Sequence, residues 1–266
     1  MENKLDLTKD YYLTCSLRET SIQENINCIR NAIYDGADAF MLHLEKIPDE
    51  EITIENLKKL YDYAGDKPVI SVNYRSRHKP NKSDEEIIEQ QIISIKAGAS
   101  CVDMFGDIFN PSANEIAIDE ETINKQKELI KKYHDLGAKV LISSHIYRYM
   151  TKDEIVSQMK LMEERGGDIA KIAMSVTSKK EAIEATKTTL DLNNEINIPF
   201  FHVCMGQYGK THRALEGFLG SKIVLCVQEY NINSNPMEQP LLRATRKVYD
   251  NVDAMMARDI MLGAIK

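Results

Sequence analysis

The sequence predicts an α/β fold, a single (β/α)8 TIM barrel, and three observations lead to this class. Short apolar runs rich in β-branched and aromatic residues recur along the chain, longer amphipathic segments separate them, and eight such units fill 266 residues. Strict alternation of strand and helix is typical of parallel strands joined by crossover helices. Because eight units in about 250 residues is the usual size of a closed barrel, we expect one catalytic barrel domain spanning residues 1–266.

Each expected strand is an apolar run bounded by polar or turn-forming residues. In chain order the runs are YYLTCSL from residue 11, ADAFMLHL from 37, KPVISVNYR from 67, ASCVDMF from 99, KVLISSH from 139, DIAKIAM from 168, IPFFHVCM from 198 and KIVLCVQ from 222. An open doubly wound sheet is the alternative for the same alternation. That fold usually carries a glycine-rich phosphate loop after its first strand, and CSLRETS contains no glycine.

The segments between these runs show helical periodicity with start and stop signals. In SIQENINCIRNAIYDG the isoleucines at 22, 26, 29 and 33 recur at helical spacing, and Gly36 stands at the expected C-terminal stop. In TKDEIVSQMKLMEERGG, Thr151 is the expected N-cap, Glu154 is its capping-box partner, and a glycine pair ends the helix. These signals fit the crossover helices of a barrel.

Composition narrows the class of protein. The net charge of -7 and the isoelectric point near 5.5 argue against general binding to nucleic acid or to an anionic membrane, because both need a basic surface. The five cysteines are odd in number and widely spaced, which predicts reduced thiols. The N-terminal segment lacks the apolar core of a signal peptide, and no apolar run reaches membrane-spanning length. We therefore expect a cytoplasmic protein.

Polar residues at the strand ends are the candidate site, because barrels place their chemistry at the carboxyl ends of strands. Arg75 ends the third run, His145 ends the fifth, and alternation puts Ser143 on the same side as His145. In the sixth run Lys171 lies on the face of Ile169 and Ala173. A lysine among apolar neighbours is the unexpected residue.

A buried lysine and a nearby histidine are suited to imine chemistry. Burial disfavours the charged amine, and a neutral amine attacks a ketone to form an imine that acidifies the adjacent carbon. A histidine could then move protons at that carbon and at a leaving hydroxyl. The spacing alone favours a plainer interpretation, in which Lys171 reaches the rim to pair with an acid and His145 is an ordinary loop residue.

The last two strands lead into loops that could bind an anion. Gly206 and Gly209 allow close approach of the backbone to a ligand, and the planar fork of Arg213 suits a carboxylate. Ser234 and Gln239, after the eighth run, are uncharged hydrogen-bonding groups. Surface arginines are common, so Arg213 could instead lie on the surface, and the loop with Ser234 and Gln239, taken alone, is better explained as a solvated loop.

Histidines and one cysteine raise a metal-site alternative. His202 and Cys204 are two residues apart and His212 is close in sequence, but this is not a known zinc spacing. A metal-dependent hydrolase using side chains from several strands is a further alternative; its candidate ligands are His43, Asp103, His145 and His202. We expect no metal and no cofactor.

The stretch SSHIYRYMTKDEIVSQMKLMEERGGDIAKIAM resembles a segment of the type I 3-dehydroquinate dehydratases, which form a Schiff base with their substrate. It is similar to the family's Ser-x-His, the following loop and helix, and a Pro-Lys-Ile-Ala-Val strand. The resemblance implies that Lys171 forms the imine and that His145 carries protons. It also implies a cofactor-free lyase of the shikimate pathway, acting on a small carboxylated keto substrate, and a homodimer.

Shorter motifs extend the resemblance. NYRS is similar to the family's Phe-Arg-Ser, which implies substrate binding by Arg75, and MGQYGKTHR is similar to a motif that implies carboxylate binding by Arg213. SNPMEQ is similar to Ser-Ala-Pro-Gly-Gln with one extra residue, which implies that Gln239 and Ser234 complete that site. His43 is a further candidate for contacting substrate hydroxyls.

Four positions depart from the family pattern. Met41 and His43 stand where the second strand has Glu-x-Arg, Lys79 where a glutamate supports the histidine, and Phe105 where the fourth strand has an acid. A site that lacks a hydrogen-bond partner for a substrate hydroxyl usually recognises that substrate poorly. The alternatives are therefore a divergent enzyme that uses imine chemistry on a different carboxylated ketone, and a small-molecule-binding barrel without activity.

Overall fold

The computed structural model describes residues 3–75, 82–231 and 238–261, with side chains as far as residue 258. The strands are β1 (Tyr12–Leu17), β2 (Ala39–His43), β3 (Val69–Val72), β4 (Cys101–Phe105), β5 (Lys139–Ile146), β6 (Ile169–Ser175), β7 (Phe200–Met205) and β8 (Ile223–Cys226). The helices are α1 (Ile22–Tyr34), α2 (Ile54–Ala64), α3 (Asp84–Ala97), α4 (Glu120–Asp135), α5 (Lys152–Glu164), α6 (Lys179–Glu195), α7 (Lys210–Leu215) and α8 (Leu242–Met261). Three 3-10 turns, η1 (Leu44–Lys46), η2 (Asp49–Glu51) and η3 (Gln207–Gly209), lie between them.

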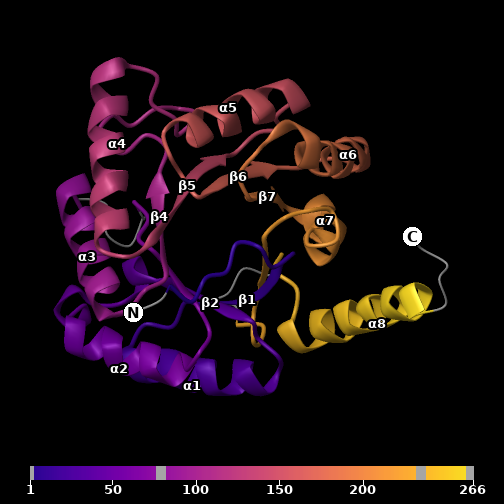
Figure 1. The fold of residues 1–266 in the computed structure, drawn as a ribbon, viewed down its shortest axis with the longest axis horizontal. Helices are drawn as coiled ribbons and strands as arrows, with labels where there is room; N and C mark the ends of the chain where they lie inside the picture. The colour runs from indigo at the N-terminus through magenta and orange to yellow at the C-terminus, as the bar shows by residue number, and fades with distance from the viewer. Residues whose placement is uncertain (1–2, 76–81, 232–237, 262–266) are drawn as a thin grey trace.

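The strands form one parallel sheet that curves into a nearly closed barrel, with helices around it (Figure 1). Their order is β7-β6-β5-β4-β3-β2-β1-β8, so each strand pairs with its neighbour in sequence and β1 also pairs with β8. Across the remaining seam, the Lys222 backbone N–H donates to the Phe200 carbonyl at 2.8 Å. A doubly wound sheet reverses its strand order at a switch point. The TIM-barrel prediction is therefore confirmed and the open-sheet alternative is wrong.

The two faces of each strand pack into different cores. Ile70, Val72, Ile169 and Ala173 belong to a cluster inside the barrel. Side chains at the alternate positions of the strands pack outward against the helices in two further clusters. Lys171 lies on β6 between Ile169 and Ala173, so it faces the interior, as alternation predicts.

The helix ends follow the expected local chemistry. The Thr151 hydroxyl accepts a hydrogen bond from the Glu154 backbone N–H and the Glu154 carboxylate accepts from the Thr151 N–H, which confirms the capping box. Gly36 follows α1 with φ +90°, a conformation that favours glycine. Ile22, Ile26 and Ile29 are buried on α1, whereas the isoleucine in its last turn is partly exposed.

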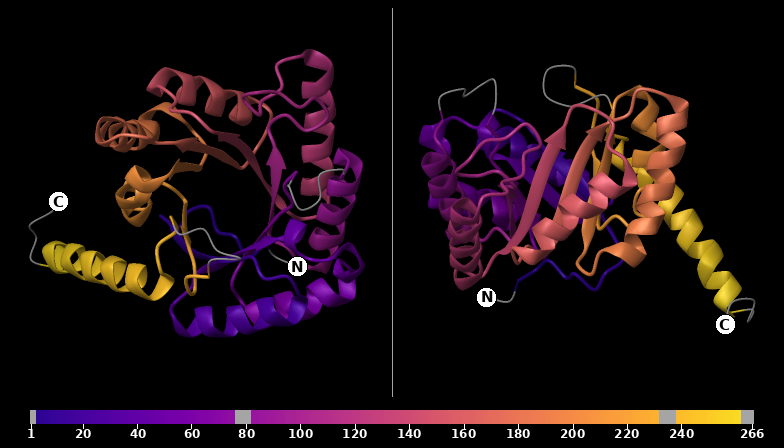
Figure 2. Two further views of the ribbon diagram at one scale, coloured as in Figure 1. Left: turned by 180° about the vertical axis from the view of Figure 1, so that it is seen from behind. Right: turned by 90° about the horizontal axis from the view of Figure 1, so that it is seen from above.

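Helices α7 and α8 differ most from the regular pattern. Helix α7 has 6 residues and follows η3, whereas α8 has 20 residues, and its C-terminal part extends beyond the barrel (Figure 2). Among the described helices, none is long and apolar enough to cross a membrane.

Candidate active site

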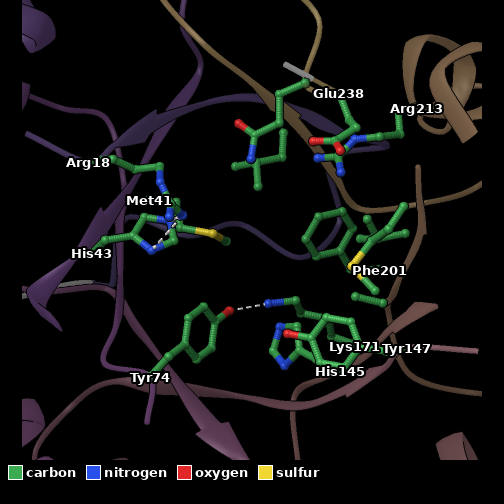
Figure 3. Close-up of a pocket in the computed structure, with 15 residues that line it drawn as sticks. Arg18, Met41, His43, Tyr74, His145, Tyr147, Lys171, Phe201, Arg213 and Glu238 are labelled. Atoms are coloured by element: carbon green, nitrogen blue, oxygen red, sulfur yellow. Dashed lines mark hydrogen bonds between the residues drawn. The ribbon is translucent and has the colours of Figure 1, made fainter. Parts of the chain in front are cut away.

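A pocket of about 350 Å³ lies at the carboxyl ends of the strands (Figure 3). Five of the predicted site residues line it: Lys171, His145, His43, Arg213 and Gln239. They come from β6, β5, β2, α7 and the segment before α8, so residues far apart in sequence meet at one end of the barrel. The volume is in the range of pockets that hold a small molecule.

Lys171 lies at the base of the pocket and is 4% exposed. Its Nζ is 2.8 Å from Asp103 Oδ2 on β4, and it also donates a hydrogen bond to the hydroxyl oxygen of Tyr74. The Tyr74 hydroxyl in turn donates to the same Asp103 oxygen at 2.7 Å. Burial alone would raise the pKa of Asp103, but the Lys171 ammonium and the hydrogen bonds from Lys171 and Ser143 hold it below its usual value.

The carboxylate partner changes the interpretation of Lys171 made from the sequence. Burial alone favours the neutral amine, whereas the ion pair with Asp103 favours the ammonium. The plainer alternative, an ion pair at the rim, is right that Lys171 pairs with an acid. It is wrong about the location, because both side chains lie inside the barrel with at most 5% exposure. Formation of an imine therefore requires a route for the ammonium protons.

His145 is held by a carboxylate from another loop. Glu115 Oε2 accepts from the His145 backbone N–H at 2.7 Å and lies 3.0 Å from its Nδ1. An ionised carboxylate only accepts hydrogen bonds, so this contact favours the tautomer with the proton on Nδ1. In the neutral ring, Nε2 is then the nitrogen that can accept a proton. Glu115 has φ +45°, which is strained for a residue with a side chain, and such strain is often found at functional sites.

The β2 side of the pocket has a neutral histidine and an apolar neighbour. His43 Nδ1 is 2.8 Å from Glu45 Oε1, and an Arg18 nitrogen lies 3.2 Å from that Nδ1. Burial, with a smaller contribution from the Arg18 charge, lowers the pKa of His43 to about 4 despite Glu45. His43 is therefore a neutral group that can hydrogen-bond to a hydroxyl, while Met41 beside it cannot form a strong hydrogen bond.

Arg213 and Gln239 form the polar end of the pocket. Each is 4% exposed. Within the described part of the chain, Arg213 Nε and Nη2 and Gln239 Oε1 have no hydrogen-bond partner. Unpaired buried guanidinium donors are costly, and a carboxylate would satisfy two of them with parallel hydrogen bonds. Ser234, predicted to complete this end, lies outside the described residues.

Arg75 is not brought into this group. It is not among the described residues that line the pocket, and its guanidinium is engaged by Asp84 at 2.8 Å and by Asp107 at 2.7 Å. The same guanidinium lies over the Phe105 ring, 4.7 Å from its centroid. In this arrangement Arg75 fastens the loop after β3 to the loop after β4. Lys79, predicted at the position of a supporting glutamate, lies outside the described residues.

The metal-site alternatives gain no geometric support. His202 lies on the outward face of β7, where Thr189 Oγ1 is 2.8 Å from His202 Nδ1 and 2.8 Å from His212 Nε2. It is therefore separated by the barrel wall from His43 and His145, which line the interior pocket. In the described residues no three or more His, Cys, Asp or Glu side chains are grouped so as to hold a metal ion.

Sequence reasoning missed three groups around Lys171 and His145. Tyr74 stands beside Arg75 and follows Ile70 and Val72 at the period of two that points to the interior, which is the signal that could have identified it. Asp103 was considered only as a metal ligand, although it alternates in the same way with Cys101. Glu115 lies in the connection between β4 and α4, and no periodic signal could have revealed its contact with His145.

The fold and the pocket together define a (β/α)8-barrel enzyme with a buried amine, an imidazole and a buried guanidinium at the carboxyl mouth of its strands. Within that class the chain belongs to the type I 3-dehydroquinase family, because the model of that family matches residues 13–254.

Two curated relatives are named 3-dehydroquinate dehydratase. The 3-dehydroquinate dehydratase of Aromatoleum aromaticum is 28% identical over 189 residues, which cover 68% of this chain and 66% of that protein. The 3-dehydroquinate dehydratase of Clostridium kluyveri is 24% identical over 211 residues, which cover 77% and 78% respectively.

Solved structures share the fold at lower identity. A 3-dehydroquinate dehydratase from Geobacillus kaustophilus has a TM-score of 0.77 at 15% identity, covering 96% of each chain. The type I 3-dehydroquinate dehydratase of Clostridium difficile, solved with covalently modified comenic acid, has a TM-score of 0.76 at 18% identity, covering 95% of this chain and 97% of that one.

Proposed function

We propose that this protein is a carbon–oxygen lyase that dehydrates 3-dehydroquinate to 3-dehydroshikimate in the shikimate pathway, through an imine on Lys171. The observation that carries the proposal is the pocket in which Lys171 and His145 lie together, in a chain of the type I 3-dehydroquinase family. Both relatives described above are 3-dehydroquinate dehydratases.

The chemistry divides between the amine and the imidazole. The Lys171 amine attacks the ketone carbon, and loss of water gives an iminium that withdraws electrons from the adjacent carbon. His145 Nε2 removes the proton from that carbon and returns it to the departing hydroxide, while Glu115 stabilises the imidazolium that forms in between. Hydrolysis of the iminium then releases the enone and Lys171. No step of this route needs a metal or a cofactor.

The polar side chains of the pocket are matched to the polar groups of the substrate. Arg213 and Gln239 bind the carboxylate, which supplies acceptors for the buried guanidinium donors. Ser234 is a further candidate for this group. His43 contacts a ring hydroxyl as a neutral hydrogen-bonding group. Arg75, predicted as a substrate ligand, forms ion pairs with Asp84 and Asp107 at the mouth of the barrel. It can contact the substrate only if those ion pairs rearrange.

The direct test is to trap the imine. The protein is incubated with 3-dehydroquinate, reduced with borohydride and digested for peptide mass analysis, while the conjugated enone is followed by ultraviolet absorbance. We expect an adduct on Lys171 together with rapid enone formation. Lys171→Ala should abolish both, and the exposed control Lys125→Ala should abolish neither. Turnover that survives Lys171→Ala would refute the imine mechanism.

A second candidate function is supported by Met41. This side chain is buried in the pocket wall beside His43, at a position where it offers no strong hydrogen bond to a hydroxyl. The same imine chemistry could therefore serve a carboxylated ketone with fewer hydroxyls. Catalytic efficiencies on a panel of cyclic keto acids would separate the two, because a family-like value on 3-dehydroquinate contradicts the altered substrate. An adduct without turnover on any member supports the binding-barrel alternative.

The cellular context is also a proposal. A cytoplasmic location is supported by the five free cysteines, and a function without nucleic acid by the negative net charge. A homodimer is supported by Val248, Met255 and Met256, large apolar side chains exposed on α8. We further propose that the catalytic barrel domain spans residues 1–266. Light scattering of the purified full chain tests the dimer.

A further inference from the structure

Lys171, Asp103 and Tyr74 form a closed ring of hydrogen bonds at the base of the pocket. The Lys171 ammonium donates to Asp103 Oδ2 at 2.8 Å and to the Tyr74 hydroxyl oxygen, and the Tyr74 hydroxyl donates to Asp103 Oδ2 at 2.7 Å. Ser143 donates to the second Asp103 oxygen, Oδ1. Figure 3 shows the Tyr74 hydroxyl directed at Lys171, and the centroids of the Tyr74 and His145 rings are 4.7 Å apart.

Imine formation from this state requires two proton transfers. An ammonium carries three protons on nitrogen and an iminium carries one, so two protons must leave Nζ. The ketone oxygen must gain two protons to leave as water. The ion pair with Asp103 makes this requirement acute, because an ammonium has no free electron pair with which to attack a ketone.

We propose that Asp103 and Tyr74 form a proton relay that carries both protons from Lys171 Nζ to the ketone oxygen of the substrate. The inference rests on the proposed imine function and assigns two further catalytic residues to it. Tyr74 contacts the substrate oxygen, and Asp103 contacts the reacting nitrogen.

Each transfer balances in atoms and charge. Nζ gives a proton to Asp103, and the free electron pair of the amine attacks the ketone carbon while the C=O π pair moves to oxygen. Tyr74 gives its hydroxyl proton to that oxygen and takes the proton held by Asp103, so a carbinolamine forms whose nitrogen is still protonated and positively charged. In a second cycle one of the two protons still on nitrogen passes through Asp103 and Tyr74 to the carbinolamine hydroxyl, the nitrogen electron pair forms the C=N bond, and the C–O bond breaks with loss of water. Asp103 ends as a carboxylate, Tyr74 as a phenol and Lys171 as the iminium.

The geometry favours Tyr74 over His145 for this task. In the carbinolamine the ketone oxygen and Nζ are bonded to the same carbon, so a group that is hydrogen-bonded to Nζ is also within reach of that oxygen. His145 is fixed at Nδ1 by Glu115, and its Nε2 is assigned to the adjacent carbon. Burial and the Asp103 charge raise the pKa of Tyr74 well above its usual value, so the phenol keeps its proton until the oxygen takes it. NYRS has a tyrosine where the similar family motif has phenylalanine.

Tyr74→Phe removes the relay hydroxyl and keeps the ring. The rate of adduct formation is measured by rapid mixing with 3-dehydroquinate and borohydride quench, together with the exchange of the ketone oxygen in ¹⁸O-labelled water. We expect both rates to fall by about 100-fold, the lower end of what general acid–base groups contribute. Binding of quinate, which has an alcohol in place of the ketone, should change by less than about twofold because the relay acts only on a carbonyl.

Matched variants separate the relay from a structural role. Tyr61→Phe removes another buried tyrosine hydroxyl, which lies 2.6 Å from Ser94 Oγ away from the pocket, and should leave the adduct rate unchanged. Asp103→Asn cannot accept the proton and should reproduce the Tyr74→Phe loss. The double variant should lose little more than either single one, because members of one relay are not additive.

The outcomes distinguish two kinds of failure. If wild-type protein and Tyr74→Phe form the adduct at the same rate, the relay is wrong and the imine function stands. If the two single losses multiply in the double variant, Asp103 and Tyr74 act independently and the relay is again wrong. If wild-type protein forms no adduct with 3-dehydroquinate, the proposed function is wrong, and the relay is wrong with it.

Discussion

Replacing Glu115 by glutamine tests whether this carboxylate positions and stabilises His145. Glu115 Oε2 accepts two hydrogen bonds from His145, at 2.7 Å from the backbone N–H and 3.0 Å from Nδ1. A hydrogen bond to a charged group contributes about 1.5–3 kcal/mol and one between neutral groups about 0.5–1.5 kcal/mol. Both side chains are at most 25% exposed, so solvent screens the difference only partly. We therefore expect a loss of about 1–2 kcal/mol when the imidazolium forms.

The loss should fall on kcat. At about 1.4 kcal/mol per tenfold change in rate, Glu115→Gln should lower kcat by about 5–30-fold. Glu115 lies behind His145, outside the pocket lining, so KM should change by less than about twofold. Steady-state kinetics on 3-dehydroquinate measure both constants. Nitrogen NMR of the His145 ring should show a smaller fraction of the Nδ1-protonated tautomer.

Glu120→Gln is the matched control, because Glu120 is exposed in the first turn of α4 and should show neither effect. An unchanged kcat in Glu115→Gln would refute the assignment of Glu115. A kcat loss with an unchanged tautomer would attribute it to charge alone and refute the positioning argument.

Three further predictions follow from packing and burial. Burial raises the pKa of Glu216 to about 8, so the folded protein binds an extra proton between pH 4.5 and 8; this stabilisation is complete below pH 4.5 and is lost as pH rises to 8, at up to about 1.4 kcal/mol per pH unit. Urea unfolding at pH 6.5 to 8 should show the decline in wild type and a flatter profile in Glu216→Gln, and equal slopes would contradict it. In Gly209→Ala the new Cβ would lie 2.4 Å from the Cys204 carbonyl oxygen, so α7 must shift with Arg213 and KM should rise about tenfold or more in steady-state kinetics, whereas an unchanged KM would show that the carboxylate is bound elsewhere. Thr151→Ala should lower the free energy of unfolding by about 1 kcal/mol through loss of the N-cap and leave kcat unchanged, as measured by denaturant titration and kinetics; a lower kcat would contradict a purely structural role.

Local rules in the sequence determined the fold and the face of each strand. Amphipathic segments with caps such as Thr151 alternate with apolar runs, and this alternation leaves parallel strands with crossover helices as the simplest arrangement. The period of two along a strand placed Lys171 on the face of Ile169 and Ala173, which is the barrel interior. These results depend on neighbours within a few residues, so a single sequence contains them.

Tertiary structure alone decided what surrounds Lys171 and His145. Asp103 and Tyr74 are 68 and 97 residues from Lys171 in sequence, and their contact depends on the register of several strands. Periodicity sets the face of a strand, but hydrogen bonding between strands and the packing of both layers set its register. The interior of the barrel that buries Lys171 therefore also holds Asp103, the carboxylate with which it forms an ion pair.

The loops show the same division most clearly. Arg75 was expected in the pocket because it ends a strand, but Asp84 and Asp107 from two other segments hold its guanidinium elsewhere. Glu115 contacts His145 because its loop adopts a left-handed backbone conformation at that residue, which no pattern of residue types specifies. The sequence by itself determined the barrel, the amine and the imidazole. The folded chain decided which charges meet them, because those contacts depend on strand register and loop conformation over long separations in sequence.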